Sequence, residues 1–223
     1  MSAVRIPALA EHTASVIFLH GLGDSGNGWR FLADEFRRLQ KLNHVAFVFP
    51  NAPIQKVTLN FGMEMPSWYD IQQLNKIEQS EDEAGMLESA GRLRAYVDAE
   101  IAAGIPAERI VIGGFSQGCT ISVLTGLTTD RTFAGVVGLS GYLPLRDKIA
   151  GMHTAAGKAT PFFWGHGTDD QVVKYEYGTA SKAILEALGQ PLEFHTYPGM
   201  THSTCPRELG HVLDFLERRL PPQ

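Results

Sequence analysis

Hydrophobic positions along the chain form two alternating patterns. Short runs of β-branched and apolar residues, typical of buried strands, cover residues 15–20, 45–49, 109–113, 134–139, 161–165 and 192–197. Apolar residues at helical spacing predict helices over residues 29–39, 117–127, 174–188 and 206–220. Strands that alternate with helices are typical of βαβ units. The sequence therefore predicts an α/β fold with a mostly parallel, doubly wound sheet and helices on both faces.

The clearest helix lies between the second and third of these strands. Its apolar face is formed, up to Gly104, by Met86, Ala90, Leu93, Val97 and Ile101. Ser80 and Glu83, three positions apart, predict a capping box at its start.

The connection over residues 51–80 is unusually long and shows no clear helix. Within it, apolar and polar residues alternate with a period of two, which predicts an extended ribbon with one apolar face. That face is formed by Val57, Leu59, Phe61, Met63 and Met65.

Composition narrows the class of protein. The 223 residues suffice for one α/β domain, and we expect residues 1–223 to form a single domain. A net charge of −5 without basic runs argues against nucleic acid as a partner. No apolar stretch approaches the roughly 18 residues of a membrane span, so we expect no stable membrane insertion. Two cysteines, Cys119 and Cys205, suit a reducing compartment, and we expect a cytoplasmic location, with the nucleus as a second one.

One pentapeptide carries nucleophilic chemistry. Gly114-Phe115-Ser116-Gln117-Gly118 matches the G-x-S-x-G elbow, in which a sharp strand-to-helix turn exposes a serine hydroxyl. A predicted buried strand precedes it and a predicted helix follows, which is the setting that the motif requires. We therefore predict Ser116 as the nucleophile of an α/β-hydrolase.

A serine nucleophile needs a histidine base that is oriented by a carboxylate. In this fold the chain order is serine, acid, histidine, and His202 follows the last predicted strand. The acid is expected after the strand that ends at Gly165, where Asp169 and Asp170 are both present. Their chemistry alone does not separate the two.

The oxyanion formed by attack on a carbonyl needs backbone N–H donors. One is expected from Gln117, which follows the nucleophile. The other is expected from the glycine-rich loop after the first strand, with Leu22 as the predicted donor.

The same glycine loop supports a rival interpretation. Residues 21–26 match G-x-G-x-x-G, the dinucleotide-binding fingerprint. That fingerprint also needs an acidic residue near the end of the second strand, and none occurs between Phe36 and Met63. No H-E-x-x-H motif indicates a metal hydrolase. We therefore expect neither a metal nor a cofactor, and a non-catalytic binding protein is the other alternative.

Taken together, the motifs resemble those of the acyl-protein thioesterase, lysophospholipase and carboxylesterase family of α/β-hydrolases, from about residue 15 to residue 220. The matching segments are residues 18–24, Pro53 with 65–70, 113–118, 143–145, His166-Gly167 with Asp170, and 199–202. The resemblance favours Asp170 over Asp169 as the acid. It implies hydrolysis of acyl thioesters or esters, without a cofactor, on S-acylated proteins, lysophospholipids or small acyl esters.

The resemblance also implies an apolar acyl site. We expect it to be walled by Trp68 and by four ribbon residues, Leu59, Phe61, Met63 and Met65. A short-chain carboxylesterase, with the ribbon as mere packing, is the alternative. The sequence departs from the family at Cys119, where a glycine is common, and this side chain could narrow the site. Whether the protein forms a homodimer is left open.

Overall fold

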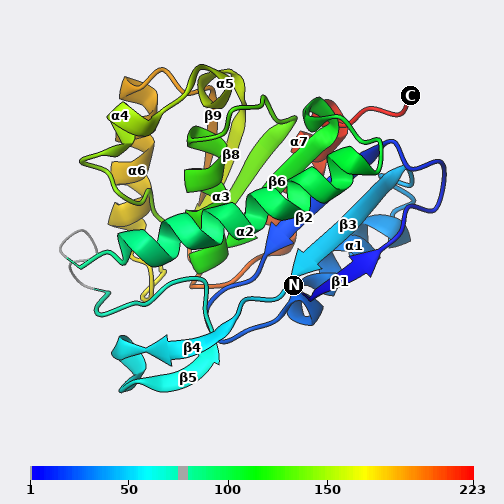
Figure 1. The fold of residues 1–223 in the computed structure, drawn as a ribbon. Helices are drawn as coiled ribbons and strands as arrows, with labels where there is room; N and C mark the ends of the chain where they lie inside the picture. Colours follow the sequence, from blue (N-terminus) through cyan, green and yellow to red (C-terminus); the bar gives the residue numbers. More distant parts are fainter. Residues whose placement is uncertain (1, 75–79) are drawn as a thin grey trace.

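The computed structural model describes residues 2–74 and 80–223. Its centre is a seven-stranded sheet with the strand order β1-β3-β2-β6-β7-β8-β9 (Figure 1). The strands are β1 (Ala3–Ile6), β2 (Ala14–Leu19), β3 (Val45–Pro50), β6 (Ile110–Phe115), β7 (Gly135–Leu139), β8 (Phe162–Gly167) and β9 (Leu192–Tyr197). All neighbouring pairs are parallel except β1 and β3. The predicted fold class is confirmed.

Helices cover both faces of this sheet. The helices are α1 (Arg30–Arg38), α2 (Glu83–Ala102), α3 (Gln117–Leu127), α4 (Ile149–Met152), α5 (Ala155–Ala159), α6 (Tyr175–Ala187) and α7 (Pro206–Arg219), and the 3₁₀ turns are η1 (Gly26–Trp29), η2 (Thr58–Asn60) and η4 (Ala107–Arg109). Buried side chains of α2, α3 and α6 form one hydrophobic core with the sheet. Those of α1 and α7 form a second core on the opposite face. The central strands therefore bury both of their faces, which explains why β2, β3, β6 and β8 are largely continuous apolar runs.

Three strands outside the predicted set complete the architecture. The edge strand β1 pairs with β3 in antiparallel orientation. The other two, β4 (Ile54–Val57) and β5 (Met63–Pro66), form a hairpin that extends from the body of the molecule (Figure 1).

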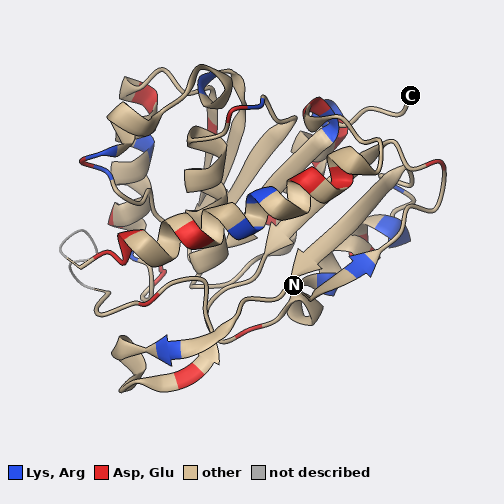
Figure 2. Ribbon diagram, viewed as in Figure 1, with Lys and Arg blue, Asp and Glu red and all other residues tan. Residues whose placement is uncertain are grey.

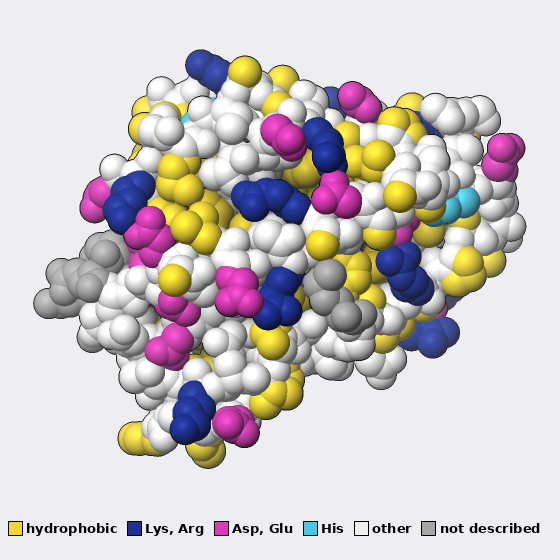
Figure 3. Space-filling model, in the orientation of Figure 1, with side chains coloured by type: hydrophobic (Ala, Val, Ile, Leu, Met, Phe, Trp, Pro, Cys, Tyr) yellow, Lys and Arg dark blue, Asp and Glu magenta, His cyan; other side chains and the backbone are white. Residues whose placement is uncertain are grey.

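This hairpin shows that the predicted single-faced ribbon is wrong. The chain reverses at η2, where Phe61 and Gly62 take left-handed backbone angles, so Val57 pairs with Met63 instead of sharing a face with it. Val57 is buried, whereas Phe61 is 97% exposed and Met63 57% exposed. Apolar side chains are accordingly visible on the hairpin in the space-filling view (Figure 3).

The start of α2 also differs from its prediction. Asp82, and not Ser80, is the N-cap, and its side chain accepts a hydrogen bond from the N–H of Gly85 at 3.0 Å. Glu81 instead accepts from the N–H of Leu145 at 2.9 Å. The helix then buries Met86, Ala90, Leu93 and Val97 as predicted.

Charged side chains of both signs are interspersed on the face shown in Figure 2. No helix in the described part of the chain combines the length and apolarity that a bilayer crossing requires.

Candidate active site

The turn between β6 and α3 presents Ser116. Its φ of 55° and ψ of −116° are a strained conformation for a residue with a side chain. The turn requires glycines on both sides. A Cβ at Gly114 would lie 2.3 Å from the carbonyl carbon of Gly118, and one at Gly118 would lie 2.2 Å from the carbonyl oxygen of Leu19. The pentapeptide therefore forms the sharp strand-to-helix turn that the motif predicts.

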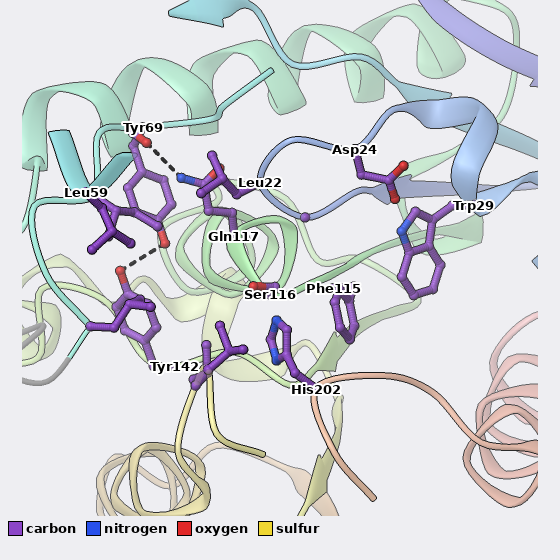
Figure 4. Close-up of a pocket in the computed structure, with 15 residues that line it drawn as sticks. Leu22, Asp24, Trp29, Leu59, Tyr69, Phe115, Ser116, Gln117, Tyr142 and His202 are labelled. Atoms are coloured by element: carbon purple, nitrogen blue, oxygen red, sulfur yellow. Dashed lines mark hydrogen bonds between the residues drawn. The ribbon is translucent and has the colours of Figure 1, made fainter. Parts of the chain in front are cut away.

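His202 and Asp170 come together from the loops after β9 and β8. Nδ1 of His202 lies 2.7 Å from Oδ2 of Asp170. Because a carboxylate only accepts, Nδ1 carries the proton and leaves Nε2 free to accept another. Figure 4 shows the imidazole beside Ser116.

The structure distinguishes the two candidate acids. Asp170 is buried, and its Oδ1 accepts hydrogen bonds from the N–H groups of Val172 and Val173, both at 2.9 Å. Asp169 is exposed, and its carboxylate accepts from the hydroxyl of Thr168 instead. Of the two aspartates, only Asp170 hydrogen-bonds to the His202 ring.

Two further histidines brace turns near the site, as their positions at strand ends predict. His20 donates from Nδ1 to the carbonyl of Gly21 at 2.7 Å and accepts at Nε2 from the N–H of Ala52 at 3.0 Å. His166 donates from Nε2 to the carbonyl of Val173 at 2.8 Å. Burial lowers the pKa of both imidazoles, so both are neutral at pH 7.

The glycine-rich loop after β2 is held in place by its neighbours. The indole N–H of Trp68 donates to the carbonyl of His20 at 2.8 Å, and the N–H of Gly23 donates to the carbonyl of Pro66 at 2.8 Å. A Cβ at Gly21 would lie 3.4 Å from Cβ of Ser116, so the loop passes directly beside the nucleophile. Leu22 therefore lies beside the pocket together with Ser116.

Gln117 begins α3, so its backbone N–H is one of the first-turn donors that have no partner within the helix. The Gln117 side chain makes separate hydrogen bonds to the segment after β5. Oε1 accepts from the N–H of Trp68 at 3.0 Å, and Nε2 donates to the carbonyl of Tyr69 at 2.7 Å. The side chain thereby ties the segment after β5 to the nucleophile turn.

An elongated, mostly apolar cavity of about 280 Å³ contains Ser116 and His202. Leu59, Tyr69 and Tyr142 lie at one end of it, and Asp24 and Trp29 lie at the other, with Ser116 and His202 between them (Figure 4). The remaining lining residues are Gly21, Leu22, Ile71, Leu74, Phe115, Gln117, Val172 and Val173. The hydroxyls of Tyr69 and Tyr142 are 2.9 Å apart.

The predicted acyl-site residues are not all part of this cavity. Leu59 lines it, whereas Phe61, Met63 and Met65 lie on the hairpin outside it. Trp68 is buried behind the wall, with its ring centroid 5.2 Å from that of His20. The ribbon prediction fails here because the turn at Phe61 and Gly62 directs the hairpin tip away.

Cys119 does not narrow the cavity. It is fully buried, and Cβ atoms built on Gly138 and Gly141 would lie 2.8 Å and 2.5 Å from its sulfur. Burial raises the pKa of this thiol far above its ordinary range, so it is not a nucleophile at neutral pH. The glycines opposite it accommodate the larger side chain.

Several lining residues were not predicted from the sequence, namely Trp29, Tyr69, Ile71, Leu74, Phe115, Tyr142, Val172 and Val173. Sequence position could have indicated some of them. Phe115, Tyr142 and the two valines lie at or soon after the carboxyl ends of β6, β7 and β8, where parallel sheets bind ligands.

Residues 2–220 match the family described as Phospholipase/Carboxylesterase. The chain belongs to this family. Acyl-protein thioesterase 1 of Yarrowia lipolytica is 52% identical over 220 residues, which cover 98% of this chain and 97% of that protein. The protein of the same name from Neurospora crassa is 46% identical, over 97% of this chain and 91% of that one. Such similarity, over nearly the whole length, shows a hydrolase of ester or thioester bonds.

Solved structures of family members have the same fold. Arabidopsis thaliana SOBER1 superposes with a TM-score of 0.87 at 36% identity, over 93% of this chain and 99% of that one. Zea mays acyl-protein thioesterase 2 superposes with a TM-score of 0.86 at 26% identity, over 98% and 99% of the two chains. This membership rules against the dinucleotide-binding interpretation of the glycine loop.

Proposed function

We propose that the protein is an acyl-protein thioesterase that works through Ser116, His202 and Asp170. The observation that carries this proposal is the 2.7 Å contact between His202 and Asp170 beside a serine in an elbow that opens into an apolar cavity. The names of the similar proteins support the substrate class. S-acylated proteins are the proposed substrates, with lysophospholipids and small acyl esters as further ones.

The proposed reaction has two halves. Nε2 of His202 takes the Ser116 proton as Oγ attacks the carbonyl carbon, and the oxyanion accepts hydrogen bonds from the N–H groups of Leu22 and Gln117. Collapse expels the thiolate or alkoxide, which takes this proton from His202. Water then attacks the acyl carbonyl carbon while His202 takes its proton, and the second collapse breaks the bond to Ser116 Oγ, which takes that proton from His202 as the carboxylic acid leaves.

The acyl chain is proposed to extend toward the end of the cavity that is lined by Leu59, Tyr69 and Tyr142. Burying a methylene there contributes up to about 0.8 kcal/mol, so four more carbons raise kcat/KM by up to roughly a hundredfold. Cytoplasmic and nuclear locations stay predictions.

The test is kcat/KM for thioesters and esters from acetyl to palmitoyl, with Ser116→Ala as the control. We expect a steep rise with chain length, acceptance of thioesters and no turnover by Ser116→Ala. A maximum at acetyl or butyryl would instead assign the site to a short-chain carboxylesterase. Turnover by Ser116→Ala would refute the mechanism.

A further inference from the structure

The two ends of the active-site cavity differ in charge. The side formed by Leu59, Tyr69 and Tyr142 carries no charged side chain, whereas Asp24 lies at the other end with Trp29 (Figure 4). Asp24 is the one carboxylate among the described residues that line the cavity. A nucleophile between an apolar end and an acidic end faces two chemically different parts of one substrate.

Asp24 is close to the nucleophile along the chain. Its N–H donates to the carbonyl of Gly21 at 3.3 Å, which closes a tight turn. The first and last Cα atoms of such a turn lie within about 7 Å of each other. Gly21 lies directly against Ser116, so the turn keeps Asp24 on the loop that passes the reacting centre, and its carboxylate points toward Trp29 (Figure 4).

The Asp24 carboxylate is available to a ligand. It is on an exposed residue, and none of the described residues donates a hydrogen bond to it or forms an ion pair with it. The next basic residue along the chain, Arg30, pairs with Asp34 at 3.2 Å instead. A Cβ at Gly28 would lie 2.2 Å from Oδ1 of Asp24, so this glycine provides the space that the carboxylate occupies.

Trp29 adds an aromatic surface whose position is fixed. Its side chain is 5% exposed, and its ring packs on Phe18 at 4.7 Å, on Phe115 at 5.3 Å and on Phe31 at 5.4 Å between centroids, so a small part of the indole reaches the cavity. Phe115 in turn contacts the His202 ring at 4.7 Å. The indole therefore forms a rigid wall that continues to the catalytic histidine. Indole rings attract organic cations more strongly than other aromatic side chains do.

We propose that Asp24 and Trp29 form a subsite for an organic cation on the leaving group. This inference rests on the proposed function, which places the acyl chain at the apolar end and the leaving group at the other. A lysine or arginine near the acylated cysteine supplies such a cation, and so does the quaternary ammonium of a choline lysolipid. The subsite thereby selects acyl donors by the charge beside the cleaved bond.

The first experiment compares S-octanoyl-cysteine peptides that differ at one position, two residues after the cysteine, with Lys, Gln or Glu. The readout is the ratio of kcat/KM between two peptides in one enzyme preparation, because this ratio does not depend on the fraction of active enzyme. We expect the wild type to favour Lys over Gln by roughly fivefold to thirtyfold, with a smaller preference at high salt.

Charge variants test whether the lysine preference comes from the subsite. Asp24→Asn should reduce the Lys-to-Gln ratio to near one, and Asp24→Lys should favour the Glu peptide. The matched control is Asp214→Asn, which removes the same charge from the exposed side of α7 outside the cavity lining and should keep the wild-type ratio. A lysine preference that Asp24→Asn leaves unchanged would overturn the subsite.

A second arm separates the two sources of the cation. Lysophosphatidylcholine and lysophosphatidylglycerol of equal chain length, below their micellar concentrations, replace the peptides. A choline preference that Asp24→Asn abolishes supports a headgroup cation, and a preference confined to the peptides supports a protein side chain. If Ser116→Ala is inactive but charge has no effect on either substrate class, the subsite fails while the proposed function stands.

Discussion

Nδ1 of His202 and Oδ2 of Asp170 are 2.7 Å apart, and the other oxygen of Asp170 accepts from two consecutive backbone N–H groups. The turn after β8 thus fixes the carboxylate, and the carboxylate fixes the tautomer and direction of the imidazole. This arrangement requires that both carboxylate oxygens of Asp170 accept hydrogen bonds.

Asp170→Asn should lower kcat by about three to four orders of magnitude, because an amide can present an N–H to Nδ1 and stabilise the wrong tautomer. The control is Asp169→Asn, which changes the adjacent exposed carboxylate. We expect it to stay within a few fold of the wild type. Steady-state kinetics on a soluble thioester measure both, and equal losses in the two variants would contradict the assignment.

Trp68→Phe tests how the oxyanion loop is held. The variant removes the donor that binds the His20 carbonyl and leaves that buried acceptor unpaired, at about 1 to 3 kcal/mol of unfolding free energy. Because the loop carries Leu22, kcat should fall while KM changes little.

The matched control for this variant is Trp164→Phe. Trp164 is fully buried in β8, and its indole N–H has no partner among the described residues. Trp164→Phe loses the same side-chain volume as Trp68→Phe, but the N–H that it removes is unpaired in the described part of the folded protein. Urea denaturation should therefore show a smaller destabilisation than for Trp68→Phe, and a larger one would argue against the loop contact.

The sheet could be predicted because its central strands are buried on both faces and therefore form continuous apolar runs. The edge strand β1 was not predicted, because its four residues include the exposed Arg5 and do not form a continuous apolar run. The β4–β5 hairpin was not predicted for another reason. Alternation with a period of two continues through its turn, and only the backbone angles at Phe61 and Gly62 show that the chain reverses.

The proposed catalytic residues were chosen from motif and chain order, and the structure brings His202 and Asp170 together beside Ser116, at the carboxyl ends of strands. The cavity wall could not be predicted, because its residues come from segments far apart in the sequence that only the tertiary structure brings together. Asp24 illustrates the limit. Its loop was identified for Leu22, but the cavity it shares with Trp29 is visible only in three dimensions.

Glu208 should make stability depend on pH. It lies in the first turn of α7, fully buried, and neither carboxyl oxygen has a hydrogen-bond partner among the described residues. Burial raises its pKa from 4.5 to about 8. The folded state therefore keeps a proton that the unfolded state loses. This contribution to stability is complete below about pH 4.5 and is lost as the pH rises to about 8, by up to about 1.4 kcal/mol per pH unit.

Glu208→Gln should flatten this dependence, because the amide does not titrate. Urea denaturation from pH 5 to pH 8.5 measures the unfolding free energy of each variant. Asp214→Asn, on the exposed side of the same helix, should keep the slope of the wild type. Equal slopes for Glu208→Gln and the wild type would show that the carboxyl is already ionised in the folded protein.

Cys119 and Gly141 should be energetically coupled. A Cβ at residue 141 would lie 2.5 Å from the sulfur and 2.6 Å from Cβ of Cys119, so Gly141→Ala overpacks this contact at a cost of about 1 to 3 kcal/mol. Cys119→Gly removes both of these atoms and leaves the Ser116 carbonyl at 3.1 Å as the nearest neighbour. Gly141→Ala should therefore destabilise the Cys119→Gly protein by much less than it destabilises the wild type. A double-mutant cycle of unfolding free energies measures the difference, and additive effects would mean that the chain relieves the contact by moving its backbone.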